Sequence, residues 1–484
     1  MKLQQTLNSS LLDNLEPMLN ESIYHFLVEF QKGRTDFSEL GSIFFRLIQT
    51  MIDPPLEFIW FYSALTFHTA KSTTLMNSQS LLLSVKDLFH SLVSFRNPSG
   101  SGSLKQVSLL APVVYQLVSF RFEISRFRSE FEGLVDAIVS HIVVCCNNEL
   151  EDREVAVGKP TVVSWVGLVP VWIADQVTEN RGCVDGLQLF LPLSTEEVRR
   201  GIGGDCGMGY LAGIVMMESF LLRLCLMFDP GASRKELDKD VKLQAAQIIK
   251  GFKKNSTFLV MLFKVLLEPR LPVAELLTTS DELLLRRLLF DVALDFGCFL
   301  SCETSSWLSD DQYKEIAILW LFVTNSALQF VSENGDTAEV DFYLNAFLTS
   351  QLPAQIISWV TGGTHTIPTT PLNSSPKELI GWLLVVEKQG IKICDHSISE
   401  LHEKAVKHNL VGIENIVETM VEDAHAPVRI NGRRKRDSMG EVQLQKQMKA
   451  IKYCHENLGG DDSYCGRNEV GNSVSDQEMV DMVR

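Results

Sequence analysis

The sequence predicts an all-α protein, and three observations support that prediction. Apolar residues recur at intervals of three and four positions over most of the chain, helix-start signals separate these stretches, and β-branched runs are rare. With 484 residues, 45% of them hydrophobic, the chain is long and apolar enough to bury a large core. We expect an irregular α-solenoid or a large multi-helix globule, followed by a disordered C-terminal tail.

The helices are expected in three regions, separated by loops with little apolar periodicity. An N-terminal helical region covers residues 1–146 and a central one covers residues 161–360. A C-terminal helical region follows at residues 376–426. The remaining residues, 427–484, are mostly polar and lose the apolar pattern, so we expect a disordered tail there.

The longest apolar stripe begins at Leu117 and ends at Ile142. Its members are three and four positions apart, which places them on one face of a helix. The pattern therefore predicts one long core helix. A coiled coil is the alternative, because the stripe extends over about three heptads.

Two further helices are expected in the central region. The first, at residues 237–252, keeps one apolar face and is charged elsewhere, which predicts a surface helix. The second, at residues 281–302, has a narrow polar line formed by Arg287, Asp291 and Asp295 on an otherwise apolar circumference. Such a helix is expected to be covered by neighbours on several sides.

Helix starts are marked by serines followed three positions later by Glu or Gln, the spacing of a capping box. The strongest signal is Ser375 with Glu378, because Pro376 occupies the first helical position between them. The other matches are Ser194 with Glu197, Ser233 with Glu236, Ser309 with Gln312, and Ser397 with Glu400.

Residues 161–166 and 169–173 are the best strand candidates, because both are rich in β-branched side chains. Pro170 disfavours a central strand and a helix interior alike. We favour a helix–turn–helix here and keep strands as the alternative.

The chain is expected to be soluble, with its most apolar helices buried in protein. The uncharged window 316–332 is interrupted by polar residues and is shorter than the roughly 20 residues of a membrane span. The window 211–228 contains Glu218 and Arg223. The 10 cysteines form no CxxC pair, and we expect buried free thiols in a reducing compartment.

The candidate ligand-binding motifs favour ordinary structural roles. The glycine-rich stretch from Gly201 to Gly209 lacks the order of a dinucleotide-binding loop and the lysine of a phosphate-binding loop, so an interhelix loop is expected. The densest group of soft ligands has its histidines on different helix faces, so no metal is expected. That group consists of Cys394, His396, His402 and His408.

Two short motifs inside predicted helices also favour packing roles. The LxxLL pattern from Leu285 to Leu289 lies on the apolar wall of its helix, and Asp295-Phe296-Gly297 lacks every other kinase signature. We therefore expect no catalytic residue and no cofactor.

The most informative motif is a run of four cations that follows Gly432. Such a cluster in a flexible, otherwise acidic chain is typical of a nuclear import signal that binds acidic pockets of an import carrier. Phosphorylation of the nearby Ser438 would place a dianion beside it and weaken binding; normal localisation of a Ser438→Asp variant would contradict this. The cluster consists of Arg433, Arg434, Lys435 and Arg436.

Over residues 1–426, the succession of helices resembles armadillo (ARM) and HEAT-like scaffolds. It is similar to plant nuclear proteins with armadillo-like helices, including accessory subunits of the structural-maintenance-of-chromosomes repair complex. The resemblance lies in architecture and transfers no site residue. It implies a role in DNA repair or chromosome maintenance through protein contacts.

The sequence therefore favours a non-catalytic helical scaffold in a nuclear multiprotein complex. A net charge of −16 argues against a nucleic-acid-coating surface, so protein partners are expected, with neither direct sequence-specific nucleic acid binding nor a membrane. One alternative is a cytoplasmic trafficking or coat adaptor. The other is a helical enzyme with a site near the loop from Gly201 to Gly209.

Overall fold

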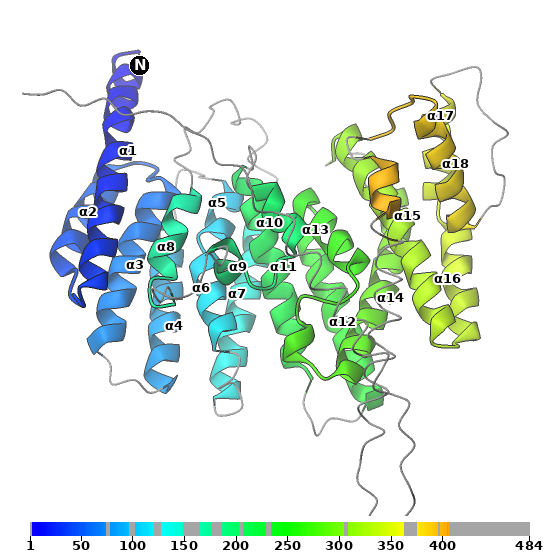
Figure 1. The fold of residues 1–484 in the computed structure, drawn as a ribbon, viewed down its shortest axis with the longest axis horizontal. Coiled ribbons are helices and arrows are strands. Elements are labelled where there is room, and N and C mark those ends of the chain that lie inside the picture. Colours follow the sequence, from blue (N-terminus) through cyan, green and yellow to red (C-terminus); the bar gives the residue numbers. More distant parts are fainter. Residues whose placement is uncertain are drawn as a thin grey trace, which may run out of the picture. The chain divides into compact units, whose positions relative to one another are not determined.

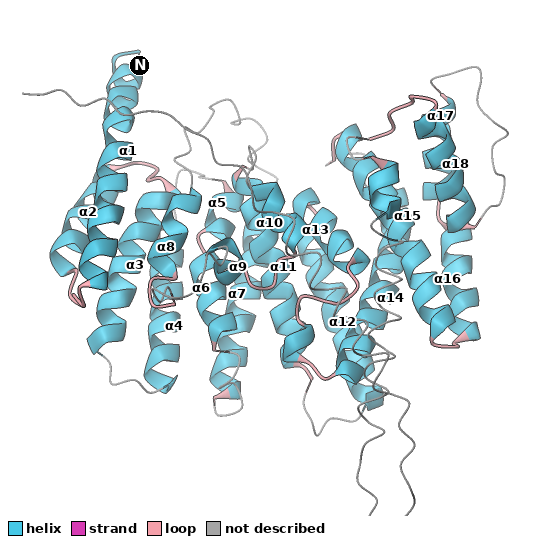
Figure 2. Cartoon of the chain, in the orientation of Figure 1, coloured by secondary structure: helices cyan, strands magenta, loops and turns pink. Residues whose placement is uncertain are grey.

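Every regular element in the described part of the chain is a helix, which confirms the all-α prediction (Figures 1 and 2). All of these residues belong to one compact unit, Met1–Glu418. The computed structural model describes residues 2–73, 78–95, 102–120, 127–148, 165–176, 186–202, 207–228, 234–303, 308–362, 375–394, 397–403 and 405.

The helices vary from single turns to long core helices. Those of the first half are α1 (Lys2–Gln31), α2 (Ser38–Thr50), α3 (Leu56–Thr73), α4 (Ser78–Ser94), α5 (Ser103–Ser108), α6 (Ala111–Ser119), α7 (Arg128–Asn148), η3 (Trp165–Leu168), α8 (Val169–Trp172), α9 (Gly186–Phe190) and α10 (Glu196–Ile202). Those of the second half are α11 (Met208–Leu226), α12 (Arg234–Phe252), α13 (Ser256–Leu267), η4 (Ala274–Leu276), α14 (Thr279–Glu303), α15 (Asp310–Glu333), α16 (Thr337–Thr349), α17 (Leu352–Thr361) and α18 (Pro376–Lys388).

From α7 onwards the longer helices form two layers. In one layer α11 packs against α13, α13 against α15, and α15 against α18. In the other layer α7, α12, α14 and α16 follow one another as neighbours. Helices of the two layers also contact each other, so each helix buries its apolar side against elements close to it in the chain (Figure 1). This stacking of sequence neighbours corresponds to the α-solenoid form of the prediction.

The N-terminal part is held together by aromatic side chains. Phe44 of α2 packs edge-on against Phe61 of α3, with ring centroids 4.7 Å apart. The buried His68 of α3 lies 2.8 Å from the carbonyl oxygen of Val171 in α8. Residues 165–172 are helical and packed on α3, and η3 continues directly into α8, so the strand alternative is wrong for these residues; residues 161–164 lie outside the described part.

Among the described helices, α11 and α15 are long and apolar enough, by length and composition, to cross a membrane. Within the protein, 83% of the apolar window of α11 and 61% of that of α15 are buried. Both therefore behave as core helices, as the sequence predicted. The side chains of Cys145, Cys146 and Cys225 are likewise buried.

The prediction of one long helix from Leu117 to Ile142 was wrong. Helix α6 ends at Ser119 and α7 begins at Arg128, while residues 121–126 lie outside the described part. The Phe120 N–H bonds the Leu117 carbonyl, a three-residue step that tightens the last turn of α6. Because α6 is buried all round, its spacing of apolar residues reflected burial and not one continuous face.

The capping predictions had mixed outcomes. Complete capping boxes are present at Ser309 and Ser375, and the Glu400 N–H donates to the Ser397 hydroxyl oxygen. The box at Ser194 was wrong: the hydroxyl of Ser194 donates back to the Leu191 carbonyl. The cap of α10 is instead Thr195, whose hydroxyl oxygen accepts the Val198 N–H at 3.2 Å. Ser233 lies outside the described residues.

Candidate functional site

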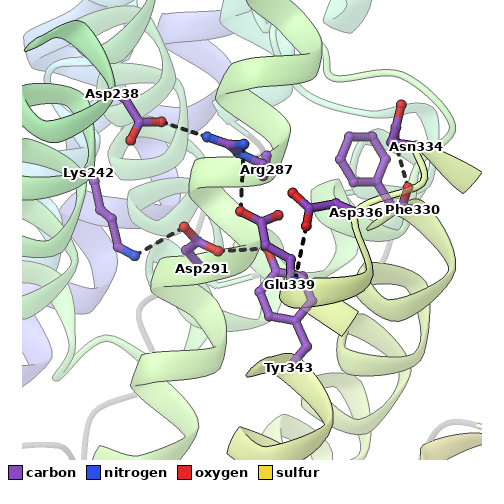
Figure 3. Close-up of polar contacts among 9 residues, drawn as sticks. All are labelled: Asp238, Lys242, Arg287, Asp291, Phe330, Asn334, Asp336, Glu339 and Tyr343. Carbon is purple, nitrogen blue, oxygen red and sulfur yellow. Dashed lines mark hydrogen bonds and ion pairs between the residues drawn. The ribbon is translucent and has the colours of Figure 1, made fainter. Parts of the chain in front are cut away.

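A cluster of paired polar side chains joins α12, α14 and α16, and we call it the polar ladder (Figure 3). Each of the three helices contributes two side chains, placed four residues apart. The six residues are Asp238 and Lys242 of α12, Arg287 and Asp291 of α14, and Glu339 and Tyr343 of α16.

The first rung is centred on Arg287. One of its terminal nitrogens lies 2.9 Å from a carboxylate oxygen of Asp238, and the other lies 3.6 Å from a carboxylate oxygen of Glu339. Asp336 caps the start of α16 by accepting the Glu339 N–H, which fixes the position of Glu339 (Figure 3). One guanidinium therefore links all three helices.

The second rung is centred on Asp291, which is buried. The ammonium group of Lys242 lies 3.0 Å from one of its carboxylate oxygens. The hydroxyl of Tyr343 donates a hydrogen bond of 2.6 Å to the other. Both oxygens of this carboxylate are thus satisfied, as a buried charge requires.

The ladder follows from helix geometry. A step of four residues is about one helical turn, so two such residues lie one above the other on the same face. Asp238 meets Arg287 and Lys242 meets Asp291, so α12 and α14 run in the same direction. The pairs to α16 keep the same order, so three parallel helices present matching turns to one another.

The electrostatics of the ladder favour a structural role. Burial raises the pKa of Glu339, while the charge of Arg287 opposes that rise. Burial works against the charged form of Arg287, but its hydrogen bond to Asp238 and the nearby carboxylates outweigh this and raise its pKa. Burial and the bond to Asp291 raise the pKa of the Tyr343 phenol. The ladder therefore keeps its arginine charged and its tyrosine neutral.

A cavity of about 430 Å³ lies beside the first rung, between α12 and α14. Arg234 and Arg287 both line it, yet each is already paired with a carboxylate, Arg234 with Asp281 and Arg287 with Asp238. Lys235 lines the cavity as well, so the lining combines three cations with the single carboxylate of Asp238.

The glycine-rich stretch has a packing role where it is described. Gly201 lies in α10, and a Cβ built there would lie 2.5 Å from the hydroxyl oxygen of Tyr210 in α11. That hydroxyl donates to the Val198 carbonyl of α10 at 2.9 Å. Glycine at position 201 therefore allows the two helices to approach. Residues 203–206 lie outside the described part.

The remaining sequence candidates divide between described and undescribed segments. Leu285, Leu288 and Leu289 are buried, so the LxxLL pattern is part of the core. Cys394 and His402 are described, and His396 and His408 are not; the described residues contain no group of three or more ligands placed for a metal ion. The import cluster at residues 433–436 and Ser438 lie outside the described residues.

The sequence indicated only one third of the ladder. The polar line on α14 was recognised, but Asp238, Lys242, Glu339 and Tyr343 were not connected with it. The available signal was the same four-residue polar step in α12, α14 and α16, which alternate along the chain with α13 and α15. The comparisons add no family to this description: no family model matches the sequence, no curated protein matches it, and no solved structure matches its fold.

Proposed function

We propose that this chain is a non-catalytic helical scaffold, an accessory subunit of a nuclear multiprotein complex that acts in DNA repair or chromosome maintenance. Its partners are proteins, which contact the exposed faces of the stacked helices. An import carrier binds the basic cluster at residues 433–436.

The observation that supports this proposal is that the charged side chains of the polar ladder pair with one another between neighbouring helices. Arg287 is shared between carboxylates of two neighbouring helices, and Asp291 is occupied by Lys242 and Tyr343. These groups fix helices against each other, which is what a rigid platform for other proteins requires. A two-layer stack also offers long helix faces on which partners can dock.

The nuclear part of the proposal depends on sequence. Four consecutive cations, Arg433 to Arg436, stand in a chain whose net charge is −16. A carrier with acidic pockets recognises such a cluster in extended form.

Purification of the tagged full chain from its own cells tests the scaffold. We expect the same set of nuclear proteins to co-purify in fixed ratio and to co-elute on gel filtration. A chain that elutes alone, or one that converts a small molecule in purified form, would contradict the proposal.

Localisation is tested separately with a fluorescent fusion. Replacing residues 433–436 by alanine is expected to move the fusion from nucleus to cytoplasm, and replacing Lys235, Lys239, Lys253 and Lys254 of the helical body serves as the charge-matched control. A wild-type fusion that stays on cytoplasmic membranes or vesicles would favour the adaptor alternative.

A further inference from the structure

A groove runs between α2 and α3, the antiparallel pair near the N-terminus. Its volume is about 520 Å³. Its floor is formed by the buried Phe37 and Leu65 together with Gly41, and Phe45 and Tyr62 stand at its wall with ring centroids 5.6 Å apart. A Cβ built on Gly41 meets no atom within 4 Å, so the space above this glycine is open.

Three of the hydroxyl groups that line the groove are already occupied. Ser42 donates to the Ser38 carbonyl, Thr66 to the Tyr62 carbonyl, and Thr69 to the Leu65 carbonyl, all within their own helices. The groove therefore offers mainly apolar contact to a ligand.

Arg46 is the one charged residue of the lining. Its Nε donates to the Ser42 carbonyl of its own helix at 3.2 Å, and within the described part of the chain it has no carboxylate partner. The terminal nitrogens of its guanidinium thus remain available for a carboxylate.

The dimensions of the groove match a helix. Its lining on α2 extends from Ser38 to Arg46, nine residues that span about 12 Å along the helix axis. Apolar anchors at positions i, i+3 or i+4, and i+7 of a bound helix cover the same two turns. The extensive contacts of α2 with other described helices are with α3 alone, which leaves its outer side open to a third helix.

We infer that the α2–α3 groove binds an amphipathic helix of a partner protein, with apolar side chains over Gly41 and an Asp or Glu at its edge that pairs with Arg46. The inference builds on the scaffold proposal and names one of its contact surfaces. The charge of Arg46 selects an acidic partner, although the chain as a whole is acidic.

Selection from a phage-displayed library of helical peptides of about 16 residues tests this inference. The bait is the purified full chain, with counter-selection against Gly41→Leu, whose side chain fills the groove. We expect enriched peptides with apolar residues over two turns and an Asp or Glu beside them. Peptides that bind wild type and Gly41→Leu equally well would overturn the groove as the site.

Synthetic copies of the enriched peptides then test each contact by fluorescence anisotropy. Gly41→Leu should weaken binding by roughly tenfold or more, while Gly41→Ala, which adds only a Cβ, should change it by less than about threefold. Arg46→Glu should weaken the acidic peptide by about fivefold or more and should favour a copy with Lys in place of Glu. Affinity independent of residue 46 would overturn the acidic partner.

Two measurements separate the other outcomes. Melting of Gly41→Leu at or above the wild-type temperature shows that lost binding is not lost folding. Self-association of the free chain in sedimentation velocity, abolished by Gly41→Leu, would assign the groove to a second copy and overturn the inference. If Gly41→Leu still co-purifies with the complex, the inference about the groove is contradicted while the scaffold proposal stands. If no complex forms with wild type, the scaffold proposal is contradicted, and the peptide measurements still decide whether the groove binds a helix.

Discussion

The hydroxyl of Tyr343 donates a 2.6 Å hydrogen bond to the buried carboxylate of Asp291, fifty-two positions earlier in the chain. The tyrosine is fully buried. This bond connects α16 to α14, and the same carboxylate also receives Lys242 from α12. The Asp291 carboxylate therefore binds an ammonium group from α12 and a phenol from α16.

Tyr343→Phe should destabilise the protein, because it leaves a buried carboxylate oxygen without its donor. The expected loss in the free energy of unfolding is about 1–3 kcal/mol. Chemical denaturation measures it. Tyr24→Phe is the matched control, since Tyr24 is 71% exposed and should be neutral. Equal midpoints for Tyr343→Phe and wild type would show that the bond is not formed in solution.

Arg287→Met should lower stability in a pH-dependent manner. Burial already raises the pKa of Glu339, and removal of the neighbouring cation raises it further. A raised carboxyl pKa favours the protonated folded state, so the loss is largest at high pH and is relieved as the pH falls. We expect a deficit of about 1–2 kcal/mol near neutral pH that shrinks towards pH 4.

Arg200→Met is the control for Arg287→Met. Arg200 pairs with Glu196 at 2.9 Å, but both side chains are more than 70% exposed. Its replacement should cost less than about 1 kcal/mol with little pH dependence. A deficit in Arg287→Met that grows as the pH falls would contradict the expected electrostatics.

Glu218→Gln should remove a pH-dependent cost of folding. Glu218 lies in α11, is 1% exposed, and accepts the Leu193 N–H; burial raises its pKa to about 8. Between the unfolded value of 4.5 and about 8, the unfolded chain releases this proton and the folded chain retains it, so wild-type stability declines as the pH rises.

The gain from Glu218→Gln should therefore grow from about pH 5 to pH 8 in thermal melts and level off above that range. Burial also raises the pKa of Glu57 to about 7, so Glu57 likewise lowers stability as the pH rises. Because Glu57 is present in both proteins, its contribution cancels in the comparison. Glu196→Gln, at an exposed position, should show no such gain. A constant difference across this pH range would mean that Glu218 is ionised in the fold.

Replacement of two helical glycines by alanine should have opposite effects. Gly41→Ala places a Cβ in open space and should raise stability by about 0.5–1 kcal/mol. Gly201→Ala places one against the Tyr210 hydroxyl and should lower the melting temperature. Adding Tyr210→Phe should restore part of that loss. A melting temperature of Gly201→Ala above that of wild type would contradict the close contact between α10 and α11.

Ser375→Ala should loosen the start of α18. The hydroxyl oxygen of Ser375 accepts the Glu378 N–H at 3.3 Å, and such a cap contributes about 1 kcal/mol. Amide exchange of Glu378 should become faster, while Ser375→Asp, which retains an acceptor, should preserve protection. Unchanged exchange in the alanine variant would show that the cap is redundant with Pro376.

The sequence was sufficient where a structural cause is local. The cap of α18 depends on neighbouring residues, Ser375 and Glu378, and was predicted correctly. The cap of α10 was assigned one residue too early because Ser194 and Thr195 are both capable caps. The choice was decided by the Leu191 carbonyl, which takes up the Ser194 hydroxyl.

The sequence was insufficient where the cause is distant in the chain. The polar line on α14 was visible, but the partners of Arg287 and Asp291 lie 49 to 52 residues away and depend on which helices are neighbours. The break between Ser119 and Arg128 was missed for a related reason. Helix α6 is covered on all sides, so the spacing of its apolar residues carries no information on where it ends.

The polar ladder has a consequence for how the protein opens. Stacked helices normally melt one repeat at a time from either end, since each touches only its neighbours. Here the guanidinium of Arg287 and the carboxylate of Asp291 connect three successive repeats. The most protected amides of residues 234–349 should therefore exchange at a common rate, as those of a single foldon do. The flanking helices, which lack this clamp, should exchange earlier.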